Sequence, residues 1–231
     1  MRKLSYLLCI MVLFSLISCG NKEENKEAET KTETAQTEGA KKYKIGITQI
    51  VSHPALDQSR EGFKDALKEA GLDVEYDEQN AQGDITIANT IANKFVTDKV
   101  DLIFSIATPT TQAAVNATSS IPIIFTAVTD PEAAGLIKPN VTGSSDRVDN
   151  VAEQLDVLKE LNPNATTIGV LYNSSEQNSV TQVELIKKIA AEKGIKVEEQ
   201  AVTAVSELTQ ALDNLLSKAD AYKRAGACGT L

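Results

Sequence analysis

The sequence predicts an α/β protein made of two doubly wound parallel-sheet lobes. Short apolar segments alternate with amphipathic segments of helical length from Tyr43 onward, and this alternation is typical of crossover units that build parallel sheets. The same rhythm restarts after Val141–Ser145. We therefore predict a first lobe over residues 43–145 and a second lobe over residues 146–231.

The first lobe is predicted to start with a strand at Tyr43–Ile50, followed by a helix that Pro54 opens and Gly71 closes. Proline suits the first turn of a helix, because its fixed φ and missing N–H cost nothing there. The spacing of the apolar residues places one stripe on the inner face of this helix. Its members are Leu56, Phe63, Leu67 and Ala70.

Further strands of this lobe are predicted around Val74–Tyr76, at Asp101–Ile106 and at Ile121–Val128. Asp84 is the expected cap of the helix after the first of these, and Thr108–Pro109 reads as a cap followed by proline at the first helical position. The inner stripe of the Asp84 helix is expected to be Ile87, Ile91 and Phe95, and the next helix has a small-residue face of Ala113, Ala114 and Ala117.

In the second lobe, Asp149 is predicted to cap a helix, a strand follows at Thr167–Tyr172, and a helix covers about Ser179–Lys193. A strand at Ile195–Val202 and a helix opened by Ser206 come next. The inner faces of the first and last of these helices are predicted to carry Leu155, Leu158 and Leu161, and Leu208, Leu212, Leu215 and Leu216, respectively.

Before the first strand, the sequence predicts a lipoprotein signal over residues 1–18. Arg2 and Lys3 precede the apolar run Leu4–Ile17, and Cys19 follows among small residues. Cleavage would make Cys19 the new N-terminus, carrying acyl chains such as palmitate. A transmembrane anchor is the alternative, but the run is shorter than the ~20 residues that a spanning helix needs. Residues 19–42 lack large apolar side chains and are predicted to be a disordered tether.

Composition and motifs exclude several classes of function. The net charge of −9 argues against a nucleic-acid partner, because phosphate contacts need a basic face. Cys9 falls in the leader and Cys228 stands alone, so no disulfide framework is expected. A single histidine and the lack of clustered Cys and His residues argue against a structural zinc site, and no glycine-rich dinucleotide or phosphate loop follows a strand. We expect no cofactor.

Polar side chains gather where strands lead into helices, which is where ligands bind in open parallel sheets. Thr108 and the Ser174–Ser179 loop come at predicted helix starts, and free backbone N–H groups there favour a ligand carboxylate. Asp130 follows a strand and would pair with an ammonium group. Opposite charges from separate loops would recognise a zwitterion such as an amino acid.

Each of these residues also has a purely structural interpretation. Thr108 can be a plain helix cap, and Asp130 before Pro131 is a turn signal. His53 before Pro54 is expected to have a surface or capping role, because no partnered nucleophile is evident. An enzyme would need a perturbed acid–base pair, for which Asp130 and the distant Glu176 are poor candidates.

Several long motifs resemble those of the ABC-transporter substrate-binding lipoproteins of the tryptophan/tyrosine type. They span about residues 43–220 in the same order and read GITQIVSHPALDQSREGFKDAL, QNAQGD, ANTIANKFV, DLIFSIATPTTQAA, IPIIFTAVTDPEAAGL, NVTGSSD and TIGVLYNSSEQNS. The resemblance implies a periplasmic-binding-protein-like fold, a flytrap whose two lobes close over a small solute. It implies no enzymatic activity.

The resemblance also implies partners, a location and a set of ligand-binding residues. The partners are an amino-acid-like solute, an ABC permease with its ATPase, and the membrane through the lipid anchor, at the periplasmic or cell-surface side. The resemblance places Gln49, Ala107, Thr108, Thr129 and Asp130 at the ligand from lobe one, and Asn173, Ser175, Asn178 and Ser179 from lobe two.

The C-terminal segment departs from the resemblance. Such proteins continue into an apolar central strand where this chain has Ala221–Arg224, so an interrupted second lobe is expected. Two alternatives to an importer component remain open. One is a ligand-sensing module of a membrane receptor, since fold alone does not choose between the two roles, and the other is a fragment without function.

Overall fold

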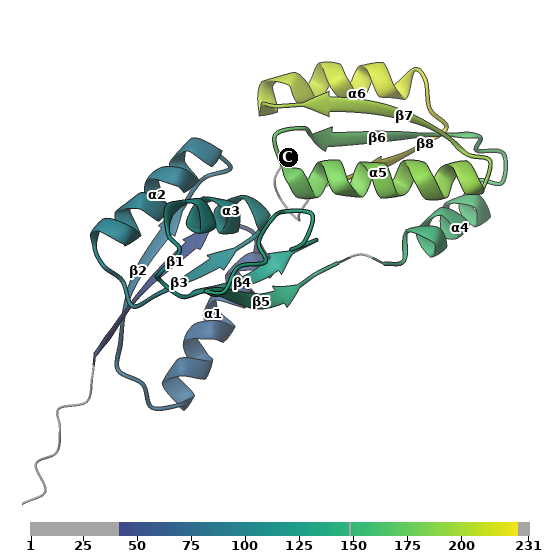
Figure 1. Ribbon diagram of the computed structural model, residues 1–231. Helices are drawn as coiled ribbons and strands as arrows, with labels where there is room; N and C mark the ends of the chain where they lie inside the picture. Colours follow the sequence, from purple (N-terminus) through teal and green to yellow (C-terminus); the bar gives the residue numbers. More distant parts are fainter. Residues whose placement is uncertain (1–41, 148, 226–231) are drawn as a thin grey trace, which may run out of the picture. The chain divides into compact units, whose positions relative to one another are not determined.

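The computed structural model describes residues 42–147 and 149–225, which form two parallel sheets with helices packed against them (Figure 1). The predicted signal sequence, Cys19 and nearly all of the tether lie outside the described residues, as does Cys228. Among the described residues, no helix combines the length and the apolar character that crossing a membrane requires.

The first sheet has five strands in the order β2-β1-β3-β4-β5, all parallel. Figure 1 shows α1 on one face of this sheet and α2 and α3 on the other. The strands are β1 Tyr43–Gln49, β2 Val74–Asn80, β3 Leu102–Ile106, β4 Ile123–Val128 and β5 Val141–Ser145, and the helices are α1 Pro54–Glu69, α2 Ile85–Thr97 and α3 Thr108–Ala117.

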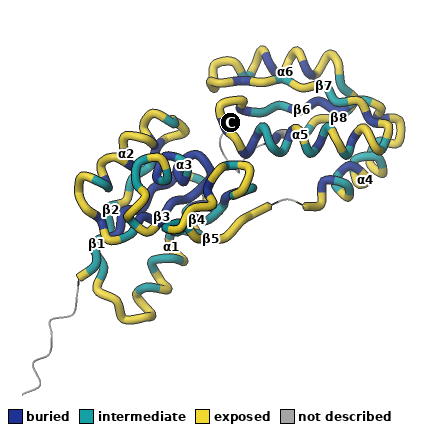
Figure 2. The backbone as a smooth tube through the Cα atoms, in the orientation of Figure 1, coloured by how far each residue is buried: buried dark blue, intermediate teal, exposed yellow. Residues whose placement is uncertain are grey.

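Close contact between α2 and β1 anchors this sheet. A side chain at Gly46 of β1 would place its Cβ 2.7 Å from the ring of Phe95, so glycine is required for Phe95 to lie directly on the strand. On the other face, the rings of Phe63 on α1 and Phe104 on β3 stack with centroids 3.9 Å apart. Figure 2 shows the central strands buried, while α1 is mostly exposed.

The second sheet has three parallel strands in the order β7-β6-β8. Gly169 of β6 permits close packing, because a Cβ there would lie 3.0 Å from the Tyr222 ring and 3.2 Å from Leu215. The elements are α4 Val151–Leu161, β6 Thr167–Asn173, α5 Gln177–Glu192, β7 Lys196–Val202, the short 3₁₀ helix η1 Val205–Glu207, α6 Leu208–Leu216 and β8 Ala221–Arg224.

Residues Ala221–Arg224 of the C-terminal segment form strand β8. Lys223 is polar where we expected an apolar strand residue, yet Ala221–Arg224 pairs in parallel with β6. The strand tolerates Lys223 because its ammonium group donates a hydrogen bond to Gln154 on α4. Burial lowers the pKa of Lys223.

The expected inner stripes were wrong at several positions. Ile87 is 39% exposed and Leu161 is 83% exposed, and Leu212 and Leu216 also face solvent. The buried residues of α2 are Ala88, Ile91, Ala92 and Phe95, and those of α6 are Ala211 and Leu215. Sequence spacing locates an apolar stripe, but the face that is buried depends on what packs against the helix.

Two predicted caps lie one residue from the observed ones, whereas Asp84 was predicted correctly. Asp84 accepts hydrogen bonds from the N–H groups of Thr86 and Ile87 at 2.6 and 3.2 Å. Helix α3 has Ala107 at its N-cap position, so Thr108 is already helical. Helix α4 has Asn150 at its N-cap, and the Asp149 carboxylate instead accepts a hydrogen bond from Arg147 at 2.8 Å.

Candidate functional site

The strands of the first sheet are parallel, so the residues at their carboxyl ends lie along one edge. Gln49 ends β1, Ala107 follows β3, Thr129 follows β4 and Asp146 follows β5. We call this edge the first rim. The corresponding edge of the second sheet, where Asn173 ends β6 and Thr203 follows β7, is the second rim.

Gln49 is buried and fully engaged in internal hydrogen bonds. Its amide nitrogen donates to the Val51 carbonyl at 2.7 Å and to the Asp57 carboxylate at 2.8 Å. Its amide oxygen accepts a longer bond from Arg60 at 3.4 Å. The side chain therefore ties the end of β1 to the first turns of α1.

Ala107 connects β3 to α3 in a backbone conformation that favours glycine. Its φ is +87° and its ψ is +158°, a combination that non-glycine residues adopt only when the surrounding structure imposes it. Its carbonyl accepts bonds from the hydroxyls of Thr110 and Thr111 at 3.0 and 2.9 Å. The chain thus holds a strained turn at the start of α3.

Helix α3 begins without a side-chain cap, because alanine occupies the N-cap position. The Thr108 hydroxyl next to it is buried and has no hydrogen-bond partner in the structure. Buried polar groups are nearly always bonded, and an uncapped helix N-terminus attracts anions. The start of α3 therefore has the properties of an anion site.

A second strained alanine lies at the end of the neighbouring strand. Ala127 of β4 has a φ of +55°, and the register between β4 and β5 shifts between Phe125 and Val128. Such irregularities occur near functional sites, where they redirect side chains. Sequence reasoning missed Ala127, because an alanine within an apolar strand carries no signal of its backbone conformation.

Thr129 and Asp130, both predicted from sequence, take part in the turn after β4. Thr129 is buried, and its carbonyl accepts a bond from the Ser145 hydroxyl at 3.0 Å. The Asp130 carboxylate accepts a bond from the Ala133 N–H at 3.0 Å and lies 3.7 Å from the Arg147 guanidinium. Asp130 therefore has both a structural partner and a counter-ion.

A pocket of about 230 Å³ opens on the first rim. Ala127 and Ser145 contribute from the ends of β4 and β5, the first two turns of α1 contribute Leu56 and Ser59, and Asp146 also lines the pocket. Burial raises the pKa of the Asp146 carboxyl, while bonds from its own backbone and from the Thr129 side chain act in the opposite direction. Asp146 was absent from the sequence-based set of site residues.

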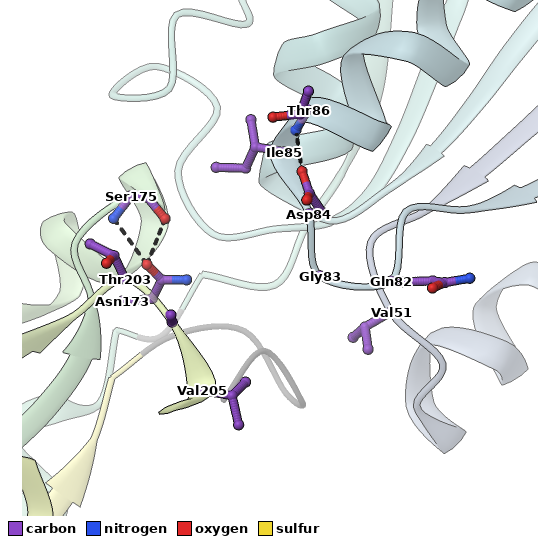
Figure 3. Close-up of a pocket in the computed structure, with 11 residues that line it drawn as sticks. Val51, Gln82, Gly83, Asp84, Ile85, Thr86, Asn173, Ser175, Thr203 and Val205 are labelled. Carbon is purple, nitrogen blue, oxygen red and sulfur yellow. Dashed lines mark hydrogen bonds between the residues drawn. The ribbon is translucent and has the colours of Figure 1, made fainter. Parts of the chain in front are cut away.

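On the second rim, the predicted side chains bond one another (Figure 3). The Asn173 amide oxygen accepts bonds from the Ser175 N–H at 3.0 Å and the Ser175 hydroxyl at 2.6 Å. The Asn173 amide nitrogen donates to Glu176 at 3.1 Å, and the Ser179 hydroxyl donates to the same carboxylate at 3.3 Å. Asn173, Ser175, Glu176 and Ser179 form what we call the Glu176 network.

Helix α5 differs from α3 at its N-terminus, because Glu176 occupies the N-cap position. This buried carboxyl group already occupies the position next to the helix N-terminus. Asn178, in the first turn, is buried with both amide atoms unpartnered in the structure. The second rim therefore has an unpartnered amide, that of Asn178, and its helix N-terminus is already occupied by Glu176.

Figure 3 also draws residues of the loops after β2 and β7 that sequence reasoning did not single out. Gln82 has a φ of +55° and Gly83 a φ of +80°, in the turn that leads to the Asp84 cap. Thr203 follows β7, and its N–H donates to Glu207 at 2.7 Å. The QNAQGD motif was the available signal for the first of these loops.

The described residues do not supply an obvious reaction centre. No group of three or more His, Cys, Asp or Glu side chains in that part of the chain is placed to hold a metal ion. The imidazole of His53 accepts a hydrogen bond from the Ala55 N–H at 3.2 Å and caps α1, as its position before Pro54 indicated.

Two parallel sheets with polar, partly unsatisfied rims define a class of α/β ligand-binding proteins. A model of the family described as ABC transporter substrate binding protein matches residues 44–225. The chain belongs to this family.

Comparisons with individual proteins agree with this assignment. A tyrosine-binding protein of Clostridioides difficile is 42% identical over 207 residues, covering 85% of this chain and 60% of that relative. The structure of an ABC domain in complex with L-Trp from Streptococcus pneumonia is 40% identical, with a TM-score of 0.74, and the match covers 80% of this chain and 65% of that one.

A periplasmic binding protein from Burkholderia mallei, 17% identical with a TM-score of 0.62, shares the fold; the match covers 83% of this chain and 55% of that one. The predicted α/β fold class is thus confirmed. The chain spans less than two thirds of the length of each of these relatives.

Proposed function

We propose that this protein is the extracytoplasmic solute-binding component of an ABC importer. It would capture a small solute, an amino acid, and deliver it to a permease without transforming it. Family membership supports the role, and the tyrosine-binding and L-Trp-bound relatives support an aromatic amino acid as the solute. The solute would favour a closed state in which both lobes contact it, and the permease would recognise that state.

The uncapped N-terminus of α3 is the observation that carries this proposal. A ligand carboxylate there would accept hydrogen bonds from backbone N–H groups of the first turn and from the unpartnered Thr108 hydroxyl. Hydrogen bonds to a charged group contribute about 1.5–3 kcal/mol each. A single helix start can therefore provide much of the affinity for the carboxylate.

Calorimetric titration with L-tryptophan, L-tyrosine and L-phenylalanine tests the proposal. We expect saturable binding of at least one of them, and weaker binding of its amide derivative, which lacks the carboxylate. The absence of any binding by this chain, together with binding by a longer relative, would favour the alternative that the chain is a fragment without function.

The variant Thr108→Val tests the carboxylate site itself, because it removes the hydroxyl and keeps the side-chain shape. We expect the affinity for the amino acid to fall by about 10-fold or more. Thr97→Val is a matched control, since the Thr97 hydroxyl bonds only the Asn93 carbonyl of its own helix at 3.0 Å. Equal affinities for the two variants would contradict the assignment of Thr108.

We also propose that the protein is anchored by lipid at Cys19 on the outer side of the cytoplasmic membrane or at the cell surface. The support is the signal pattern that ends at Cys19. Growth with labelled palmitate should label the protein, and the Cys19→Ala variant should remain unlabelled. Labelling that persists in this variant would refute the proposed site.

A further inference from the structure

An amino-acid ligand carries an ammonium group, and burying that charge requires a counter-ion. Asp130 was the sequence-based candidate, but the structure gives it other partners. Its carboxylate caps the turn at Ala133 and lies beside the guanidinium of Arg147. A ligand ammonium at Asp130 would have to compete with a cation that is already present.

Asp146 lies at the end of the adjacent strand and differs from Asp130 in its charge environment. Among the described residues, no lysine, arginine or histidine forms an ion pair with it. The neighbouring Arg147 is directed to Asp130 and to Asp149, whose carboxylate lies 2.8 Å from it. Asp146 is therefore a carboxylate without a counter-ion.

The backbone holds Asp146 in a defined place within the pocket of the first rim. Its N–H donates to the Val128 carbonyl at 3.1 Å, which joins the end of β5 to the end of β4. The preceding Ser145 is fixed by its bond to Thr129. The backbone that carries the carboxylate is thus positioned before any ligand arrives, which lowers the entropic cost of binding.

The pocket has the size of a site for one charged group of a ligand, with Asp146 in its lining. At about 230 Å³ it is smaller than the ~300–1,000 Å³ typical of pockets that enclose a whole ligand. The Asp146 side chain is accessible to solvent, yet the surrounding protein atoms desolvate it enough to raise its pKa. An accessible carboxylate in a partly desolvated pocket is a favourable place for a cation.

We propose that Asp146, rather than Asp130, is the counter-ion for the ammonium group of the solute. This inference rests on the proposed function. Together with the carboxylate site at α3, it places both charges of a zwitterion on the first rim, at the ends of β3 and β5. The side chain of the solute is then left for other parts of the protein to recognise.

The test compares an amino acid with its desamino analogue, which lacks only the ammonium group. We expect the purified protein to bind L-tryptophan or L-tyrosine more tightly than the analogue, and Asp146→Asn to abolish this preference. The affinity for the amino acid should fall by about 10- to 100-fold, the amount expected for a hydrogen-bonded charge. The affinity for the analogue should be unchanged or higher, because no buried charge is left unpaired.

The matched control is Asp149→Asn, which removes the same charge from an exposed residue three positions along the chain. It should preserve the preference for the amino acid, which separates a local counter-ion from a general field effect. Asp146→Ser provides a second variant with a smaller side chain, and unfolding curves of all variants should coincide with that of the parent.

The possible outcomes separate this inference from the proposed function. If the parent protein binds no amino acid, the proposed function fails, and this inference fails with it. If the parent binds and Asp146→Asn keeps both the affinity and the preference, only the role of Asp146 is refuted. Loss of the preference in Asp130→Asn instead would return the role to Asp130.

Discussion

At the first rim, the backbone is strained and the Thr108 hydroxyl has no hydrogen-bond partner. At the second rim, by contrast, most polar side chains bond one another. The first rim has two alanines with positive φ, the unpartnered Thr108 hydroxyl and the Asp146 carboxylate, which has no counter-ion among the described residues. The second rim has the Glu176 network, with Asn178 as its unsatisfied member.

The difference indicates that the two rims have different roles in binding a ligand. Strained conformations persist only where the surrounding structure imposes them, and the first rim is supported by a five-stranded sheet with two buried apolar clusters. The second sheet has three strands, and its rim is held by local hydrogen bonds. We infer that the first rim supplies the groups that bind the charged ends of a ligand, namely the Asp146 carboxylate and the hydrogen-bond donors at the start of α3. The second rim supplies a rigid polar surface.

The largest effect is expected from breaking the Glu176 network with Glu176→Ala. The change leaves the buried Asn173 amide and the Ser179 hydroxyl without their shared acceptor, and an unsatisfied buried group costs about 1–3 kcal/mol. Chemical denaturation should show the loss, and hydrogen exchange should locate it in α5 and β6. Glu192→Ala, an exposed change at the other end of α5, should have little effect; equal losses would mean that the network is not what stabilises this rim.

A smaller effect of opposite sign is expected at the first rim from Ala107→Gly. Glycine adopts a φ of +87° without strain, so we expect the free energy of unfolding to rise by up to about 1 kcal/mol, the release of strain exceeding the added chain entropy and the loss of the buried methyl group. Ala117→Gly, within the same helix, should instead destabilise by about 0.5–1 kcal/mol. A destabilised Ala107→Gly variant would show that the turn is not strained.

The smallest effect concerns Asp220, which ties the start of β6 to the loop before β8. Its carboxylate accepts bonds from the N–H groups of Thr166 and Thr167 at 2.9 and 3.0 Å, and these bonds lower its pKa. A carboxyl whose pKa is lower in the folded state stabilises that state above the unfolded pKa of about 3.9, and the contribution is lost as the pH falls through the folded value.

The variant Asp220→Asn should therefore be less stable than the parent at neutral pH, and the difference should shrink below about pH 4. Denaturation curves measured across this range provide the test. Asp213→Asn, a change on the exposed face of α6, is the matched control and should leave stability nearly unchanged. A difference between Asp220→Asn and the parent that is constant with pH would show that the carboxylate charge is not responsible.

The sequence by itself determined the order and type of most elements, because these depend on local patterns; strands β5 and β8 were not predicted. Apolar strands alternating with helical stripes leave parallel sheets as the consistent arrangement, and Asp84 caps its helix through bonds to residues two and three positions away. Helix starts at proline and ends at glycine are equally local. Such features are readable along the chain because the interacting groups are neighbours in it.

Only the tertiary structure decided which side chains at the rims lack a hydrogen-bond partner or a counter-ion. Asp130 and Asp146 look alike in sequence, and they differ because Arg147 turns toward one of them. The strain at Ala107 and Ala127, and the exposure of Ile87 and Leu161, follow from neighbours in space. Hydrogen-bond satisfaction and burial depend on contacts between distant segments, and no local pattern encodes them.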